Sequence, residues 1–177
     1  ILFAALEAVD PYKAVQKHLP NLSGRVYGLA IGKASIPMLT ALAEAYPLSG
    51  ALAISKHASS SPSNLFPVFL GSHPIPDSRS LEAGTRVLDF VSALDEKDTL
   101  VCLISGGGSA LVTAPYNGIS LEDMQSLTSL LLACGARIDE INTIRRSLDQ
   151  VKGGGLARAT KAKIISLILS DVIGNPL

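Results

Sequence analysis

Four places in the sequence put a residue that can bind or transfer a charged group beside glycines or directly after an apolar run. These are Lys33, the Ser-Gly-Gly-Gly-Ser run at residues 105–109, Lys152 and Asp171. A lysine can neutralise a phosphate or an attacking oxygen, glycine backbones can surround an anion, and a carboxylate can hold Mg²⁺. Together these residue types favour chemistry on phosphate or carboxylate groups.

The run at residues 105–109 follows the apolar residues 100–104, which are typical of a strand buried on both faces inside a parallel sheet. In open α/β sheets, ligands bind at the carboxyl ends of such strands. Glycine has no Cβ and reaches positive φ, so its backbone N–H groups can approach an anion closely. We interpret the run as a phosphate or carboxylate cradle, with a tight turn that binds nothing as the alternative. The members of the cradle are Ser105, Gly106, Gly107, Gly108 and Ser109.

Three well-known motifs fit the sequence incompletely. Gly28-Leu-Ala-Ile-Gly32-Lys33 is one residue short of a P-loop and lacks Ser or Thr after the lysine. Leu111 stands where both the dinucleotide fingerprint and the nucleophile elbow need glycine, which disfavours NAD binding and a serine hydrolase built on Ser109. Lys33 can still neutralise a phosphate from a strand-to-helix turn, with a plain surface lysine as the alternative.

The other candidates each have a structural alternative. The three glycines after Lys152 form a second glycine cluster beside a cation, or simply end a helix. Asp171 directly follows a long apolar segment, where it is placed to hold Mg²⁺ with phosphate oxygens or to cap a helix. His73 could act as a general base, but a histidine that holds a turn is favoured.

Composition limits the classes of partner. The 177 residues are 47% hydrophobic, enough for one packed domain, and 15 basic residues balance 15 acidic ones. This balance disfavours nucleic acid and membrane surfaces as partners, and no apolar run is long enough to span a bilayer. Small molecules are the expected partners. Cys102 and Cys134 are expected to be buried free thiols, which fits a reducing compartment.

The hydrophobic pattern alternates between strands and helices. Strands are expected at residues 26–31, 51–55, 99–104 and 162–169, with helices between them, and the apolar stripe of residues 121–134 is expected to be core. This alternation predicts an α/β fold of three layers, α/β/α, with a mostly parallel, Rossmann-like sheet. The strand ends that carry Lys33, Lys56, residues 105–109 and Asp171 then meet at one edge. The chain starts without Met and stops in an expected loop, so we expect a fragment.

Six motifs, in this order and over nearly the whole chain, resemble the type II glycerate kinases. They are Gly32-Lys-Ala34, Ser72-His-Pro-Ile-Pro-Asp77, Leu103-Ile-Ser-Gly-Gly-Gly-Ser-Ala-Leu111, Asn142-Thr-Ile-Arg145, Val151-Lys-Gly-Gly-Gly-Leu-Ala157 and Leu169-Ser-Asp-Val-Ile-Gly174. The resemblance implies ATP- and Mg²⁺-dependent transfer of the γ-phosphoryl group to D-glycerate, giving 2-phosphoglycerate. It also implies a large α/β/α N-terminal domain and a smaller C-terminal domain, with the active site between them.

Several assignments follow from the resemblance. Lys33 matches a lysine implicated in catalysis, residues 105–109 match the glycine-rich active-site segment, and Asp171 matches an acidic active-site position and would hold the metal. Lys152 is assigned to the substrate or its phosphate. Asn175 stands where the family usually has a second aspartate, which puts the role of that carboxylate in doubt.

Residues 1–177 are then expected to be an incomplete N-terminal domain without the C-terminal one, and nearly inactive alone. The alternative is a non-catalytic module that binds a sugar acid or a nucleotide. A cytoplasmic location is expected, with mitochondria as the alternative, and a homodimer is compatible with these features.

Overall fold

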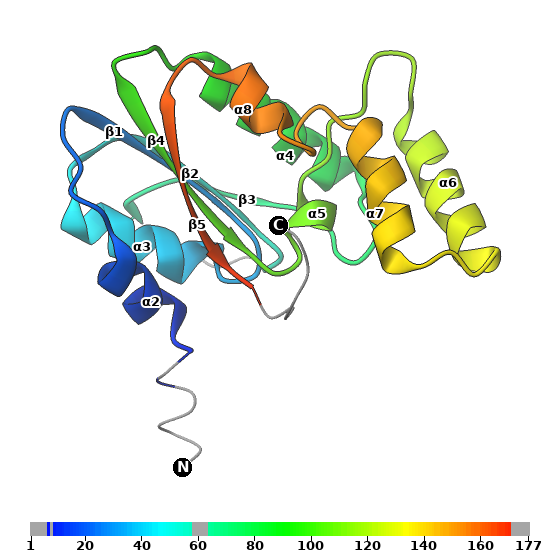
Figure 1. Cartoon of the computed structure of the whole chain (residues 1–177), viewed down its shortest axis with the longest axis horizontal. Helices are drawn as coiled ribbons and strands as arrows, with labels where there is room; N and C mark the ends of the chain where they lie inside the picture. The colour runs from blue at the N-terminus through cyan, green and yellow to red at the C-terminus, as the bar shows by residue number, and fades with distance from the viewer. Residues whose placement is uncertain (1–6, 8, 58–63, 171–177) are drawn as a thin grey trace.

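The computed structural model describes residue 7, residues 9–57 and residues 64–170. In this part of the chain the four expected strands are present, together with a short fifth strand that the hydrophobic pattern did not predict (Figure 1). The strands are β1 (Arg25–Ile31), β2 (Leu48–Ser55), β3 (Val68–Leu70), β4 (Asp98–Ser105) and β5 (Lys163–Leu169). The helices are α2 (Pro11–His18), α3 (Ser35–Ala45), α4 (Ser78–Ser92), α5 (Gly108–Leu111), α6 (Leu121–Ala133), α7 (Ile138–Ser147) and α8 (Gly155–Ala159).

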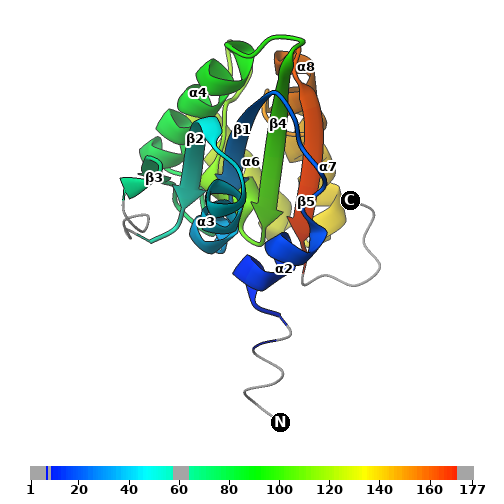
Figure 2. The ribbon, with the colours of Figure 1, turned by 90° about the vertical axis from the view of Figure 1, so that its left-hand side faces the viewer.

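The strands form one parallel sheet in the order β3-β2-β1-β4-β5, which Figure 2 shows side by side. Ile31 of β1 pairs with Ile54 of β2 and with Ile104 of β4, so these strands end level with one another. Helices α2 and α3 cover one face of the sheet, and α4 and α8 cover the other (Figure 1). The expected three-layer α/β/α fold with a parallel sheet is confirmed.

The face covered by α3 is packed by one of two hydrophobic clusters. Met38, Leu39 and Leu42 of α3 lie against Val101 and Leu103 of β4, and all five side chains are buried. Burying a side chain of this size contributes about 1.5–3 kcal/mol relative to its exposure to water. These contacts fix α3, and with it the turn that precedes α3, against the sheet.

The opposite face is packed by a second cluster under α4. Val87 and Val91 of α4 lie with Leu52 of β2 and with Leu100 and Cys102 of β4. Neighbouring β4 residues alternate between the two clusters, which explains why this strand reads as an unbroken apolar run. Burial also raises the pKa of the Cys102 thiol to about 12, so this cysteine is a buried free thiol as expected.

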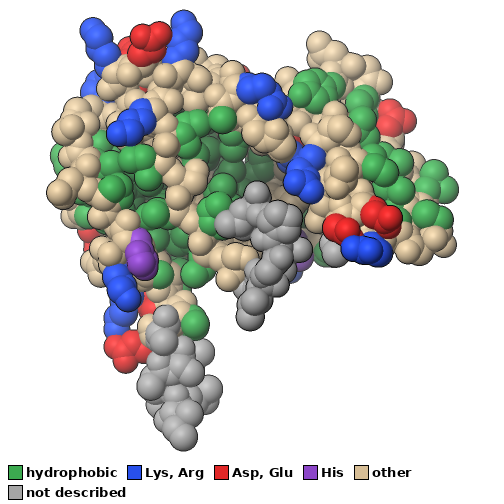
Figure 3. Space-filling view, in the orientation of Figure 1, with side chains coloured by type: hydrophobic (Ala, Val, Ile, Leu, Met, Phe, Trp, Pro, Cys, Tyr) green, Lys and Arg blue, Asp and Glu red, His purple; other side chains and the backbone are tan. Residues whose placement is uncertain are grey.

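Helices α6 and α7 lie side by side beyond one end of the sheet, away from its two faces (Figure 1). Of the stripe expected to be core, Met124 is buried, but Cys134 is exposed. Leu130 and Leu132, on the same helix, are 68% and 61% exposed. Figure 3 shows hydrophobic side chains on the surface of this region. The predictions of a fully buried stripe and a buried Cys134 were therefore wrong, because α6 does not pack on the sheet.

Element ends differ from the predictions by a few residues. Strand β2 starts at Leu48, before the expected residue 51, and α7 ends at Ser147 although its apolar spacing continues to Val151. Helices α4 and α6 each begin with a capping box, at Asp77 and at Ser120. None of the helices in the described ranges is long and apolar enough to cross a membrane.

Candidate functional site

Two turns at the carboxyl edge of the sheet are tied together by hydrogen bonds. The Lys33 N–H donates to the Gly106 carbonyl at 3.0 Å, and the Ala34 N–H donates to Ser105 Oγ at 3.0 Å. Gly32 has a φ of +133°, and a Cβ there would lie 2.2 Å from Ser105 Oγ. The close approach of the turns after β1 and β4 therefore requires glycine at position 32.

The backbone reverses direction at Gly107, which has a φ of +88° and caps the short helix α5. Its carbonyl accepts the N–H groups of Ala110 and Leu111 at 3.1 and 3.3 Å. Ser109 is exposed, whereas Leu111 is completely buried. The predicted glycine turn at the end of a buried strand is confirmed, although the sequence did not indicate α5, and the anion-binding role of the turn stays a prediction.

Side chains from two other strand ends lie against this glycine turn. A Cβ built on Gly107 would lie 3.1 Å from His73 Cδ2 and 3.3 Å from Lys33 Cε. The pKa of His73 is lowered, first by burial and then by the positive charges of Lys33 and Lys56. The structure therefore brings together the residues that follow β1, β2, β3 and β4, and these surroundings disfavour the protonated form of His73.

A cavity of about 290 Å³ opens beside the same turn. Its polar side chains are those of Ser105, Ser109 and Lys152, and Gly107 and Gly108 also line it. The rest of the lining is apolar, from Ile31, Ile104, Val112, Val151 and Leu156. A mostly apolar cavity with a few convergent polar groups is the usual form of a small-molecule site.

Lys152 lines this cavity but is also part of a buried network. Its ammonium donates to the Val112 carbonyl at 2.9 Å and to the Asp149 carboxylate. The side chain of Lys152 is 10% exposed and that of Asp149 is 0% exposed. Burial lowers the pKa of Lys152, and the Asp149 charge opposes that shift. Lys152 thus lies where a phosphate could reach it, held in place by a partner that the sequence prediction missed.

Two residues of this region were not predicted as site residues. Asp149 and Arg145 are buried, with 0% and 8% of their surface exposed. Buried ionisable residues are rare unless they are paired or functional, so burial is the signal that identifies them. Sequence spacing alone does not show burial, although Arg145 is the last residue of one of the motifs quoted above.

The predicted metal ligand Asp171 and the variant position Asn175 lie outside the described residues. Within residues 9–57 and 64–170, and including residue 7, no group of three His, Cys, Asp or Glu side chains could hold a metal ion. Asp149 already accepts hydrogen bonds from Thr113, Ala114, Val151 and Lys152. These residues therefore do not fit a Mg²⁺ site, and the roles of Asp171 stay predictions.

A family model described as "Domain of unknown function (DUF4147)" matches residues 1–177, the whole chain. The chain belongs to the DUF4147 family.

Relatives of this DUF4147 chain include curated enzymes. It is 43% identical to the "D-glycerate 2-kinase" of Thermotoga maritima, covering 100% of this chain and 44% of that protein. It is 39% identical to a "Putative hydroxypyruvate reductase" of Agrobacterium vitis, covering 99% of this chain and 41% of that protein. The crystal structure of the glycerate kinase from Thermotoga maritima matches with a TM-score of 0.91 and 43% identity, over 98% of this chain and 43% of that one. The chain thus spans less than half the length of these relatives.

Proposed function

We propose that this chain is part of a kinase that transfers the γ-phosphoryl group of ATP to a hydroxyl of D-glycerate, giving 2-phosphoglycerate. The observation that carries the proposal is the meeting of Lys33, the glycine turn at residues 105–109 and the cavity lined by Lys152 at one edge of the sheet. The kinase names of the relatives support it. ATP and D-glycerate are then the small-molecule partners.

Phosphoryl transfer depends on positioning and on stabilising negative charge, which these groups can supply. Lys33 is exposed, and its side chain lies beside Gly107, so its ammonium can reach an oxygen on the transferred phosphoryl group. The N–H groups of Gly107 and Gly108 lie in the turn that borders the cavity, where they can approach phosphate oxygens. Ser105 has a different role, because its hydroxyl accepts the Ala34 N–H and so fixes the turn next to Lys33.

The remaining wall of the active site comes, in this proposal, from residues outside this chain. The relatives are more than twice as long as the matched region. We take residues 1–177 as an incomplete N-terminal α/β/α domain that needs a C-terminal domain for activity. The isolated chain is expected to bind substrates weakly and to turn over little.

Hydride transfer, which the reductase name of the Agrobacterium relative would require, has weaker support. A dinucleotide fingerprint needs a third glycine for close packing of helix on strand, and this chain has Leu111 there, completely buried. A non-catalytic module that binds a sugar acid or a nucleotide is the other alternative, and only an activity measurement separates it from a kinase.

The test is ADP release with D-glycerate and Mg²⁺-ATP, using the full-length protein that contains this chain. We expect ADP release that depends on D-glycerate. Lys33→Ala is expected to lower kcat by about 10²–10³-fold, the typical effect of removing one group that stabilises transition-state charge. Lys97→Ala is the control, because Lys97 is exposed and precedes β4 at the opposite edge of the sheet.

If the full-length protein binds ATP or D-glycerate but releases no ADP, the kinase proposal is wrong and the binding module is supported. If it releases ADP and Lys33→Ala keeps full turnover, Lys33 has no role in the reaction. Analysis of the product by nuclear magnetic resonance shows which hydroxyl receives the phosphoryl group. The homodimer and the cellular location stay predictions.

A further inference from the structure

The wall of the cavity behind Lys152 contains two cations and a single carboxylate. Arg145 is in the last turn of α7, and Asp149 and Lys152 follow it in the turn that leads to α8. All three charged groups are buried or nearly so, with Arg145 8% and Asp149 0% exposed and the Lys152 side chain 10% exposed. A charge buried to this extent is costly unless an opposite charge or several hydrogen bonds compensate it.

Asp149 is fully compensated by the protein. Its Oδ2 accepts hydrogen bonds from the Thr113 hydroxyl at 2.6 Å, the Ala114 N–H at 3.3 Å and the Lys152 ammonium. Its Oδ1 accepts the Val151 N–H at 2.9 Å. The carboxylate is therefore held rigidly, and its single negative charge is shared between the cations on either side.

Arg145 is compensated much less. One of its Nη atoms donates to the Ser109 carbonyl at 3.3 Å, and its buried Nε has no hydrogen-bond partner in the described part of the chain. Among the described residues, Asp149 is the carboxylate whose charge acts on the pKa of Arg145, and burial lowers that pKa. The charge of the same carboxylate also acts on the pKa of Lys152. One positive charge in this wall is thus left without a counter-charge among the described residues.

The uncompensated charge lies next to the glycine turn. Ser109, whose carbonyl accepts from Arg145, lines the cavity together with Lys152. In the described structure, the Lys152 ammonium uses two of its three N–H donors, on Asp149 and Val112. An anionic group in the cavity would supply both the missing negative charge and an acceptor for the third donor.

We infer that Arg145, Asp149 and Lys152 form a preorganised phosphate site, which binds the phosphate groups of the nucleotide in the adjoining cavity, with Arg145 as the positioning residue. This inference rests on the proposed kinase function and adds to it a place for ATP and a role for Arg145. Arg145 supplies the unbalanced positive charge, and its hydrogen bond to the Ser109 carbonyl holds the glycine turn beside the phosphates.

The lining of the cavity favours a nucleotide over D-glycerate in this place. Most of the lining is apolar, which suits the base of a nucleotide, whereas D-glycerate is polar throughout. Polar side chains that do not line the cavity also lie against the glycine turn, namely Lys33 and His73 next to Gly107. D-glycerate would therefore bind beside Lys33, next to the glycine turn, with its hydroxyl directed at the γ-phosphate.

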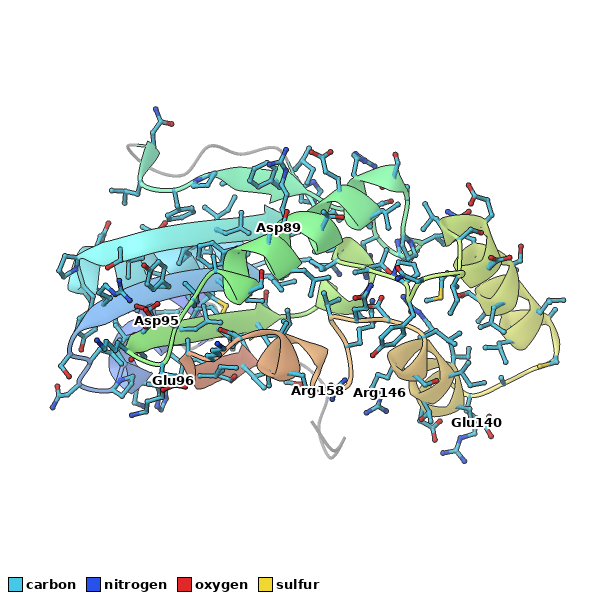
Figure 4. The ribbon with its side chains drawn as sticks, turned by 90° about the horizontal axis from the view of Figure 1, so that it is seen from above. Asp89, Asp95, Glu96, Glu140, Arg146 and Arg158 are labelled. Carbon is cyan, nitrogen blue, oxygen red and sulfur yellow. The ribbon has the colours of Figure 1, made fainter. Side chains whose placement is uncertain are left out.

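The experiment measures KM for ATP, KM for D-glycerate and kcat separately in the full-length protein. Arg145→Gln removes the charge and keeps a long side chain, and Arg145→Lys keeps the charge. The control is Arg146→Gln, because Arg146 is the exposed neighbour of Arg145 on α7, labelled in Figure 4. Thermal unfolding of each variant shows that it is folded.

We expect Arg145→Gln to raise KM for ATP by about tenfold or more, because the unbalanced positive charge that attracts the phosphates is lost, with KM for D-glycerate unchanged. Arg145→Lys restores most of the affinity for ATP, and Arg146→Gln behaves like the wild type. The inference is overturned if folded Arg145→Gln keeps the wild-type KM for ATP, if KM for D-glycerate rises instead, or if Arg145→Lys is as impaired as Arg145→Gln.

Binding of inorganic tripolyphosphate, measured by calorimetry, separates this inference from the proposed kinase function. If the wild-type full-length protein shows no kinase activity, it should still bind tripolyphosphate, and Arg145→Gln should bind it more weakly. If Arg145→Gln does not fold, the wild type and Arg145→Lys are compared instead, and both should bind tripolyphosphate. Absence of tripolyphosphate binding to the wild type contradicts the phosphate site, whatever the activity.

Discussion

The positive charges next to the glycine turn are held in two different ways, by which we distinguish a Lys33 side and an Asp149 side. On one side, Lys33 is exposed and lies beside the half-buried His73. On the other side, Arg145 and Lys152 are buried around the Asp149 carboxylate. Lys33 can adjust to a ligand because water solvates it, whereas Arg145 and Lys152 are fixed by the packing and by hydrogen bonds. Function is thus separable from stability on the Lys33 side but coupled to stability on the Asp149 side.

The largest difference between the sides is expected when Asp149 is changed. Asp149→Asn keeps the size of the side chain but leaves Arg145 and Lys152 without their shared carboxylate, which should cost about 3–5 kcal/mol of unfolding free energy. Urea unfolding followed by circular dichroism measures this loss. The matched control is Asp95→Asn, since Asp95 pairs with Arg25 on the surface, where both side chains are more than half exposed.

Loss of an exposed ion pair such as the Asp95 pair costs about 0–1 kcal/mol. Equal losses for Asp149→Asn and Asp95→Asn would show that the buried carboxylate does not balance the two cations, and the contrast between the two sides would fail.

A smaller loss is expected at the point where the turns after β1 and β4 meet. Gly32→Ala places a Cβ 2.2 Å from Ser105 Oγ, and overpacking of this kind costs about 1–3 kcal/mol. Gly118→Ala is the control, because Gly118 also has positive φ, +89°, but no atom lies within 4 Å of its Cβ position. Chemical unfolding of both variants separates the clash from the backbone strain. If Gly118→Ala loses as much unfolding free energy as Gly32→Ala, the clash with Ser105 does not contribute to the loss.

The smallest effect concerns the charge on His73. Its pKa is lowered by burial first, and then by Lys33 and Lys56. Lys33→Ala should therefore raise the pKa of His73, without reaching its ordinary value near 6.5, because burial and Lys56 remain. Titration of the imidazole resonances by nuclear magnetic resonance measures the shift, with Lys97→Ala as a control that leaves it unchanged. If the pKa of His73 stays the same in Lys33→Ala, the charge of Lys33 does not act on the imidazole.

The sign of the linked stability effect follows from the same shift. Because the folded-state pKa of His73 lies below that of the unfolded chain, the unfolded chain holds more protons in the pH window just below 6.5. The contribution of His73 to stability is complete above that window and decreases as the pH falls through it. His73→Asn should remove this part of the pH dependence.

The sequence predicts the sheet well, because the information for its strands is local. The apolar run before Ser105 and the capping residue Asp77 mark strand β4 and helix α4 within a few residues of their observed ends. The parallel order then brings the ends of β1 and β4 together, so that the meeting of Lys33 with the glycine turn follows from topology. For the same reason, the sequence identifies the exposed side of the site.

The buried side of the site depends on contacts between distant residues, which local patterns do not contain. Asp149 is held by Thr113, which lies 36 residues earlier in the chain, and Arg145 by the carbonyl of Ser109. Neither contact has a spacing that a helix or strand would produce. The prediction that the apolar stripe of α6 is buried failed for a related reason. Its helical spacing does not show whether a sheet is available to cover it.

The hydrogen bond between the Ala34 N–H and Ser105 Oγ also has a consequence for folding kinetics. It joins residues that are 71 positions apart, so it cannot form until β1 and β4 have found each other. Closing so long a loop costs conformational entropy before the contact returns any energy, which slows folding of parallel sheets. A ligand at this edge would therefore bind only chains in which β1 and β4 are paired, and its binding would stabilise the folded chain over the unfolded one.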